Sequence, residues 1–194
     1  MPVQSSAELG LAIGKPCPEF SLPGIDGKTH SLSSFKDMPV LALVVSCNHC
    51  PYVQAAEDRM IAFQREYASK GVQLIAINPN DEKVYPEDSF EGMKSRAKAR
   101  GFNFVYLRDE SQKVAKSLGA QCTPEFFVFG KDRKLVYHGR LDDGYKEAAR
   151  AKKHDLREAA DAALAGKPVH EPVTMAMGCS IKWKSEPAGL HQLR

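Results

Sequence analysis

The stretch "SCNHCPYV", residues 46–53, decides the fold because it joins two different hydrophobic patterns. Before it, "PVLALVVSC" at 39–47 is a continuous β-branched and leucine run, typical of a strand buried on both faces. After it, residues 51–69 carry apolar side chains at helical spacing, namely Val53, Ala56, Met60, Phe63 and Tyr67. The sequence therefore predicts a strand-to-helix junction that holds two cysteines, Cys47 and Cys50.

A thiol at such a junction is predicted to be reactive. Free backbone N–H groups and a partial positive charge at a helix N-terminus stabilise a thiolate and lower its pKa. We expect Cys47 to be the attacking thiolate and His49 to favour that thiolate further. Cys50, one helical turn on, is then the more buried, resolving thiol. Pro51 fits the first turn, where its missing N–H forfeits little.

The remainder of the chain alternates between strand and helix patterns. Predicted strands cover 72–80, 102–109, 123–130 and 134–140, and predicted helices cover 88–101, 110–119 and 145–166. Two short strands around a Gly-rich turn are expected within 17–35. The early strands should be parallel and the last two should form an antiparallel hairpin. The predicted class is α/β, in three layers around a central mixed sheet, with an N-terminal β-hairpin extension.

The length of 194 residues suggests one domain, which we place at 1–166 with its N-terminal extension. A C-terminal tail at 167–194 is rich in Pro, Gly and polar residues. Its few large apolar side chains predict that the tail packs back on the domain. Cys179 within it is then expected to approach the cysteine pair as an additional redox thiol, or else to belong to a segment that only covers a sheet edge or a helix face.

The composition of the chain limits the classes of partner, location and cofactor that we expect. The net charge is +3, from 27 basic and 24 acidic residues, which does not argue for nucleic acid or an anionic membrane as a partner. There is no apolar run of the roughly 18 residues that a membrane helix needs, and no signal-peptide pattern at the N-terminus. The cysteine count of five is odd, so a disulfide-stapled secreted protein is not indicated and a cytoplasmic location is expected. No nucleotide, haem or flavin motif is visible, so no cofactor is expected.

A second element is "QCTPEFFVF" at 121–129, which precedes a strand facing the same end of the sheet. A proline loop there exposes backbone groups that pair with an extended chain, so Thr123 and Pro124 are predicted to bind substrate. An X-Pro bond at such a place is a candidate for the cis form. Cys122 should lie near Cys47, as an additional redox thiol, a metal ligand or a packed small residue.

Several longer motifs carry a family resemblance. The N-terminal "PCPEFSLPGIDGKTHSLSSF", with "CNHCPYV", "CTPEFFVF", "GRLDD" and "GCSIKW", resembles thioredoxin-fold redoxins of the AhpC/TSA type, which are related to peroxiredoxins. The resemblance implies a thioredoxin-like fold and thiol–disulfide exchange, in which Cys47 forms a mixed disulfide that Cys50 resolves. It also implies a protein or small-molecule disulfide or peroxide as substrate, and an electron donor of the thioredoxin or glutathione type.

Three alternatives stay open. A thiol peroxidase would use the peroxiredoxin pattern Pro-x-x-x-Thr-x-x-Cys, but Val44 stands three residues before Cys47, and Cys47 itself three before Cys50. A metal-binding module would draw on Cys47, His49, Cys50 and Cys122. The chain lacks a second Cys-x-x-Cys, so no metal is expected. The third alternative is an interaction protein that kept the fold and lost the chemistry.

Overall fold

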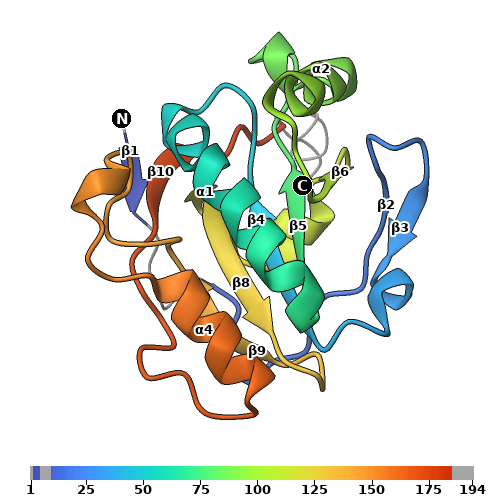
Figure 1. Cartoon of the computed structure of the whole chain (residues 1–194). Coiled ribbons are helices and arrows are strands. Elements are labelled where there is room, and N and C mark those ends of the chain that lie inside the picture. The colour runs from blue at the N-terminus through green and yellow to red at the C-terminus, as the bar shows by residue number, and fades with distance from the viewer. Residues whose placement is uncertain (1, 5–9, 185–194) are drawn as a thin grey trace, which may run out of the picture.

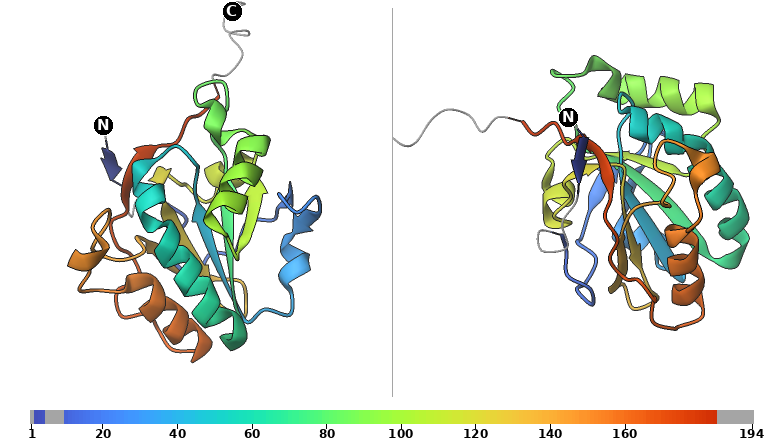
Figure 2. Two further views of the ribbon diagram at one scale, coloured as in Figure 1. Left: turned by 45° about the horizontal axis from the view of Figure 1, so that its top comes forward. Right: turned by 90° about the vertical axis from the view of Figure 1, so that its left-hand side faces the viewer.

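The computed structural model describes residues 2–4 and 10–184, which build a central sheet with elements packed on both of its faces (Figures 1 and 2). The strands are β1 (Pro2–Gln4), β2 (Ser21–Pro23), β3 (Thr29–Ser31), β4 (Val40–Val45), β5 (Val72–Asn78), β6 (Val105–Arg108), β7 (Cys122–Thr123), β8 (Glu125–Phe129), β9 (Leu135–Gly139) and β10 (Met177–Ser180). The α-helices are α1 (Pro51–Tyr67), α2 (Phe90–Arg100), α3 (Lys113–Ser117) and α4 (Asp155–Leu164). Short 3-10 helices are η1 (Leu32–Phe35), η2 (Ala68–Lys70), η3 (Pro86–Asp88) and η4 (Ala148–Arg150).

The order of strands in the main sheet is β6-β5-β4-β8-β9. β4 pairs in parallel with β5, and β5 with β6, whereas β8 runs antiparallel to β4 and β9 antiparallel to β8. This mixed sheet, with the cysteine pair directly after its central strand, has the thioredoxin-like architecture that the sequence predicts. The predicted parallel pairing of the early strands and the predicted antiparallel hairpin at the end of the sheet are confirmed.

β4 separates the two halves of the core. Its residues alternate between the faces of the sheet: Val40, Ala42 and Val44 pack with residues of α1, α2 and α4. Leu41, Leu43 and Val45 pack on the other face with α3 and the N-terminal hairpin. All six side chains have no solvent exposure. At roughly 1.5–3 kcal/mol for each fully buried aliphatic side chain, β4 is a major source of stability and a rigid support for the loop that follows it.

The predicted helix over 145–166 is shorter than expected. α4 begins only at Asp155, and a loop with the single turn η4 precedes it. Tyr145 has a φ of 48°, in the left-handed region that a right-handed helix excludes. The Asp143 carboxylate also accepts the backbone N–H groups of Lys152 and Lys153, at 2.7 and 3.0 Å, which folds this segment into a closed loop.

A second, three-stranded sheet pairs the N-terminal strand β1 and the strand β7 with β10, which lies near the end of the described chain. Its order is β1-β10-β7, with antiparallel pairing throughout. The segment after α4 runs back along the domain in both views of Figure 2, pairs with β1 as β10, and continues past it. Within it Ile181 is buried, whereas Met175 and Trp183 are exposed. The division at residue 166 stays a prediction, and residues 185–194 of the predicted tail lie outside the described residues.

None of the helices in the described part of the chain has the length and apolar character needed to cross a membrane.

Candidate active site

The junction between β4 and α1 places the two cysteines differently from the prediction. α1 begins at Pro51, so Cys50 is its capping residue and Cys47 lies in the loop that leads to it. A residue before proline avoids helical dihedrals, and Cys50 is extended, with φ −71° and ψ 121°. Cys50 therefore lies at the positive end of the helix. Cys47 lies near the helix start, as expected, but in the loop before the cap, because Pro51 fixes where the helix begins.

The charge on the pair follows this geometry. A hydrogen bond from Cys47 is the largest influence on Cys50, and with Cys179 and the backbone N–H of Val53 it lowers the pKa of Cys50 to about 5 against the effect of burial. Burial, the hydrogen bond to Cys50 and the negative charge of Asp88 raise the pKa of Cys47 well above its ordinary value. These directions favour the charge on Cys50, and the attacking role expected of Cys47 stays a prediction.

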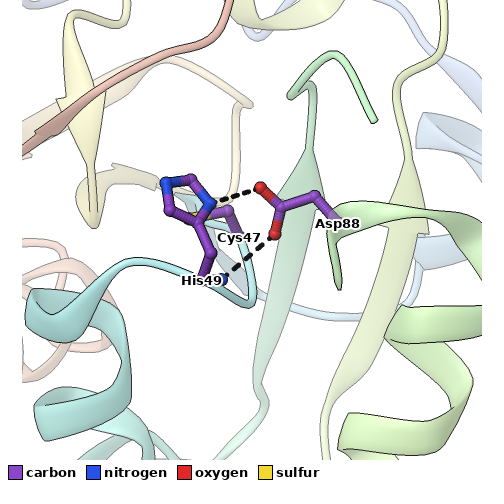
Figure 3. Close-up of side chains that lie close together, drawn as sticks. All are labelled: Cys47, His49 and Asp88. Carbon is purple, nitrogen blue, oxygen red and sulfur yellow. Dashed lines mark hydrogen bonds and ion pairs between the residues drawn. The ribbon is translucent and has the colours of Figure 1, made fainter. Parts of the chain in front are cut away.

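Asp88, which was not among the predicted site residues, holds the loop between the two cysteines (Figure 3). Its Oδ1 accepts the backbone N–H of Asn48 at 2.6 Å and that of His49 at 3.2 Å. Its Oδ2 accepts from the Asn80 amide at 2.7 Å. Burial alone would raise the pKa of Asp88, but the hydrogen bonds from His49, Asn80 and Asn48 outweigh it and lower that pKa. This carboxylate is fully buried and ionised.

His49 contacts Asp88 and Tyr85. Its Nδ1 lies 2.5 Å from Oδ2 of Asp88, and its ring stacks on the Tyr85 ring with centroids 3.7 Å apart and planes 5° apart. The predicted tuning role of His49 stays a prediction. His49 contacts Asp88, so any effect of His49 on the thiols would act through that carboxylate. The negative charge of Asp88 raises the pKa of Cys47 and so favours the charge on Cys50.

Thr123 contacts both thiols. Its Oγ1 lies 3.3 Å from Cys47 Sγ, and its carbonyl oxygen lies 3.2 Å from Cys50 Sγ. The Thr123–Pro124 peptide bond is cis. The backbone of Thr123 is already paired with β10, where Cys179 is its register partner. In this conformation the site predicted to hold a substrate chain is filled by the protein's own strand.

Cys179 is brought to the pair, and Cys122 is not. Cys179 Sγ lies 2.7 Å from Cys50 Sγ, and burial raises the pKa of Cys179 to about 12. Cys122 neighbours Thr123 on β7, so its side chain points to the opposite face. There its Sγ lies 4.0 Å from Oε2 of Glu125, and burial raises the pKa of its thiol. The alternative of a packed small residue fits Cys122 best.

Among the described residues, Cys47, His49 and Asp88 form a group whose potential ligand atoms lie within 4.8 Å of one another. The set differs from the one that the sequence suggested, since Cys122 faces Glu125 and Asp88 takes part instead. Asp88 already accepts hydrogen bonds on both oxygens from the loop and from Asn80. We interpret the group as a hydrogen-bonded support for the cysteine loop.

Sequence reasoning missed Asp88 because the fold, and not the local pattern, brings it to the loop. The residue stands at the start of the predicted helix 88–101, where an acidic side chain has a local explanation. Its contact with Asn48 spans 40 residues of sequence. The available signal was the parallel pairing of β4 with β5, since the segments that follow parallel strands meet at one edge of the sheet.

Comparison with known proteins gives related oxidoreductases. Chloroplastic peroxiredoxin Q of Triticum aestivum is 30% identical over 126 residues, which cover 61% of this chain and 53% of the relative. The thiol-disulfide oxidoreductase ResA of Bacillus cereus is 25% identical over 131 residues, covering 68% of this chain and 71% of the relative. The chain thus spans about half the length of the peroxiredoxin that it matches.

A solved structure matches over nearly the whole chain. The crystal structure of an uncharacterized conserved protein from Geobacillus kaustophilus superimposes on this chain with a TM-score of 0.89 and 40% sequence identity. The match covers 97% of this chain and 98% of that protein. The model of the AhpC/TSA family matches residues 13–138, which include β4, the cysteine loop, α1 and Thr123–Pro124. With more than half of its length matched by that model, and with the fold and the thiol site at the positions described, the chain belongs to the AhpC/TSA family.

Proposed function

We propose that the protein is a thiol–disulfide oxidoreductase in which Cys47 and Cys50 form the redox pair. The observation that carries this proposal is the position of the two thiols at the start of α1, where Thr123 contacts Cys47 Sγ at 3.3 Å and Cys50 Sγ at 3.2 Å. The low pKa of Cys50, about 5, is consistent with it. At neutral pH the pair holds one thiolate and one thiol in direct contact. This is the arrangement from which an intrachain disulfide forms when an oxidant takes two electrons.

The low pKa of Cys50 also favours the return reaction. Thiol–disulfide exchange is faster when the leaving thiol has a low pKa, and Cys50 is such a leaving group whenever a disulfide that contains it is attacked at the other sulfur. The substrate class is a protein or small-molecule disulfide. The electron donor is a thiol of the thioredoxin or glutathione type. The relation to ResA, a thiol-disulfide oxidoreductase by name, supports this assignment.

Redox titration tests the proposal. The protein is equilibrated in glutathione buffers, alkylated, digested and mapped by mass spectrometry. We expect one two-electron couple in the peptide that contains Cys47 and Cys50, and we expect Cys179→Ser to keep it. Cys47→Ser and Cys50→Ser should each abolish it. Retention of the same intrachain couple after either of these two substitutions would exclude the proposal.

A thiol peroxidase is the second candidate, favoured by the charge on Cys50. A thiolate at a helix N-terminus is also the nucleophile that attacks a peroxide, and one relative is a peroxiredoxin by name. The reacting cysteine would then be Cys50 instead of the expected Cys47. Anaerobic addition of one equivalent of an organic hydroperoxide discriminates: disulfide formation within seconds supports a peroxidase, and formation no faster than for free cysteine excludes it.

The cytoplasm is the location that we propose for this chemistry. The odd number of cysteines, five, does not fit a disulfide-stapled secreted protein and supports this proposal. Fractionation of cells with an antibody to the protein tests this location directly.

A further inference from the structure

The reactive pair is closed to solvent. Cys47 is 1% exposed and Cys50 is fully buried. Thiol–disulfide exchange requires one sulfur to approach another directly, so a peptide or glutathione molecule cannot reach either sulfur in this conformation. Cys179 has intermediate exposure and is the third sulfur of the cluster, in contact with Cys50. Of these three sulfur-bearing residues, Cys179 is therefore the one that an external thiol or disulfide can meet.

The strand that carries Cys179 is seated unusually close to β7. A Cβ atom placed on Gly178 would lie 1.9 Å from the Thr123 carbonyl oxygen, which real side chains do not tolerate. Glycine at this position therefore allows β10 to reach Thr123 and brings Cys179 Sγ to 2.7 Å from Cys50 Sγ. β10 thus occupies the sheet edge where an extended substrate chain would pair, and it presents its own cysteine to the thiolate.

An open hollow lies over Cys179. It measures about 400 Å³ and is lined by His49, Pro51, Tyr52, Tyr85, Ser180 and Lys182. The positive charge of Lys182 lowers the pKa of Cys179 in opposition to burial. Aromatic rings and one ammonium group suit a peptide-like thiol or disulfide that carries a carboxylate. Glutathione is of this size class and charge.

We propose that Cys179 is the external thiol of a three-cysteine relay, which exchanges disulfides with a carboxylate-bearing, peptide-like substrate in this hollow and passes the oxidation inward to Cys50 and then to Cys47. The proposal rests on the proposed function of the Cys47–Cys50 pair. It replaces direct attack on the substrate by that pair with attack by the only one of the three sulfurs that reaches the surface.

The relay moves two electrons in three successive thiol–disulfide exchanges. The Cys50 thiolate acts as the general base: as Cys179 Sγ attacks the substrate disulfide RSSR′, its proton passes to the neighbouring Cys50. Cys179–S–S–R forms and R′S⁻ leaves, and R′S⁻ then takes the proton from Cys50. Cys50 then attacks Cys179 Sγ, forms the Cys50–Cys179 disulfide and releases RS⁻. Cys47 attacks Cys50 Sγ, forms Cys47–Cys50, and hands its proton to the departing Cys179. Two electrons have moved to the substrate, which leaves as one thiol and one thiolate. A donor thiol reverses the sequence.

Single-turnover exchange with glutathione disulfide tests the relay. Reduced protein is mixed with the disulfide, quenched with acid and alkylated at timed points, and its disulfides are mapped. We expect the Cys50–Cys179 disulfide to appear before Cys47–Cys50. Cys179→Ser should slow oxidation of the pair by about tenfold or more, because the external attack is lost. Cys122→Ser is the matched control and should stay within about twofold of the wild type.

Two further variants test separately the placement of Cys179 beside Cys50 and the order in which the thiols react. Gly178→Ala keeps all three thiols but displaces β10, so it should slow exchange as Cys179→Ser does. In Cys50→Ser, glutathione should accumulate on Cys179. Oxidation of Cys179→Ser at the wild-type rate, or accumulation of glutathione on Cys47 in Cys50→Ser, would overturn the relay. At equilibrium, the Cys179→Ser variant should still form the Cys47–Cys50 disulfide. If neither this variant nor the wild type forms that disulfide, the proposed function itself is refuted, and not only the relay.

Discussion

The hydrogen bond from Cys47 to Cys50 predicts how two neighbouring substitutions differ. Cys47 makes the largest contribution to the pKa of Cys50, which is about 5. A hydrogen bond to a charged group contributes about 1.5–3 kcal/mol, and one pKa unit corresponds to about 1.36 kcal/mol. Cys47→Ala removes this donor and should therefore raise the pKa of Cys50 by about 1–2 units, to about 6–7. Cys47→Ser keeps an O–H donor and should leave the pKa near its present value.

The assay is the ultraviolet absorbance of the thiolate, followed against pH under anaerobic, reducing conditions. At pH 6 the thiolate fraction should fall from about 90% in the wild type to about 10–50% in Cys47→Ala. The other thiols are silent there, because burial raises the pKa of Cys17 and that of Cys179 to about 12. Cys50→Ser should show no thiolate below pH 7. A titration of Cys47→Ala that overlays the wild type, or a low-pKa thiolate that survives in Cys50→Ser, contradicts the assignment of the charge to Cys50.

Three more predictions concern the surroundings of the pair. Asp88→Ala strands the donors of the cysteine loop and should lower the free energy of unfolding by about 2–5 kcal/mol in urea denaturation, whereas the exposed Asp58→Ala should change it by less than about 0.5 kcal/mol. Burial raises the pKa of Glu125 from 4.5 to about 7. The contribution of the protonated Glu125 side chain to the free energy of unfolding is therefore complete below pH 4.5 and is lost as pH rises toward 7. The difference in stability between wild type and Glu125→Gln should therefore change by about 3 kcal/mol between pH 4.5 and 7, and a constant difference would refute the buried, protonated state. Tyr106→Phe removes the partner of the Asn48 side chain, 2.9 Å away, and should cost about 1 kcal/mol in the same denaturation assay. An unchanged midpoint would show that this hydrogen bond contributes no net stability.

The sheet could be predicted from the sequence because its signals are local and periodic. The continuous apolar run at 39–47 specifies a strand buried on both faces, and the short connection before Leu135 specifies a hairpin. The length of the last helix was harder to predict from the sequence. The segment after Tyr145 has helical composition, but the positive φ of Tyr145 and the contacts of Asp143 outweigh that preference.

The sequence predicted which residues lie together at the junction, whereas their roles in the reaction stay predictions and the charge distribution was not foreseen. The residues from Cys47 to Cys50, with Thr123, lie together as expected, since their positions follow from the order of strands. Which thiol carries the charge depends on where α1 starts and on Asp88, and neither is visible in the spacing of the cysteines. The occupation of the Thr123 backbone by β10 was also hidden, because it rests on the absence of a side chain at Gly178.

The distance in sequence between Cys50 and Cys179 also has a consequence for the newly made chain. The two are 129 residues apart, so at 5–20 residues per second the ribosome completes the covering strand about 6–26 s after the thiol pair. During that interval the family domain is made and the pair has no β10 over it. A nascent chain therefore offers Cys47 and Cys50 to cellular oxidants and to Cys17 in a way that the finished protein does not. Pulse-labelled chains caught before release should react with alkylating reagents at positions that are shielded minutes later.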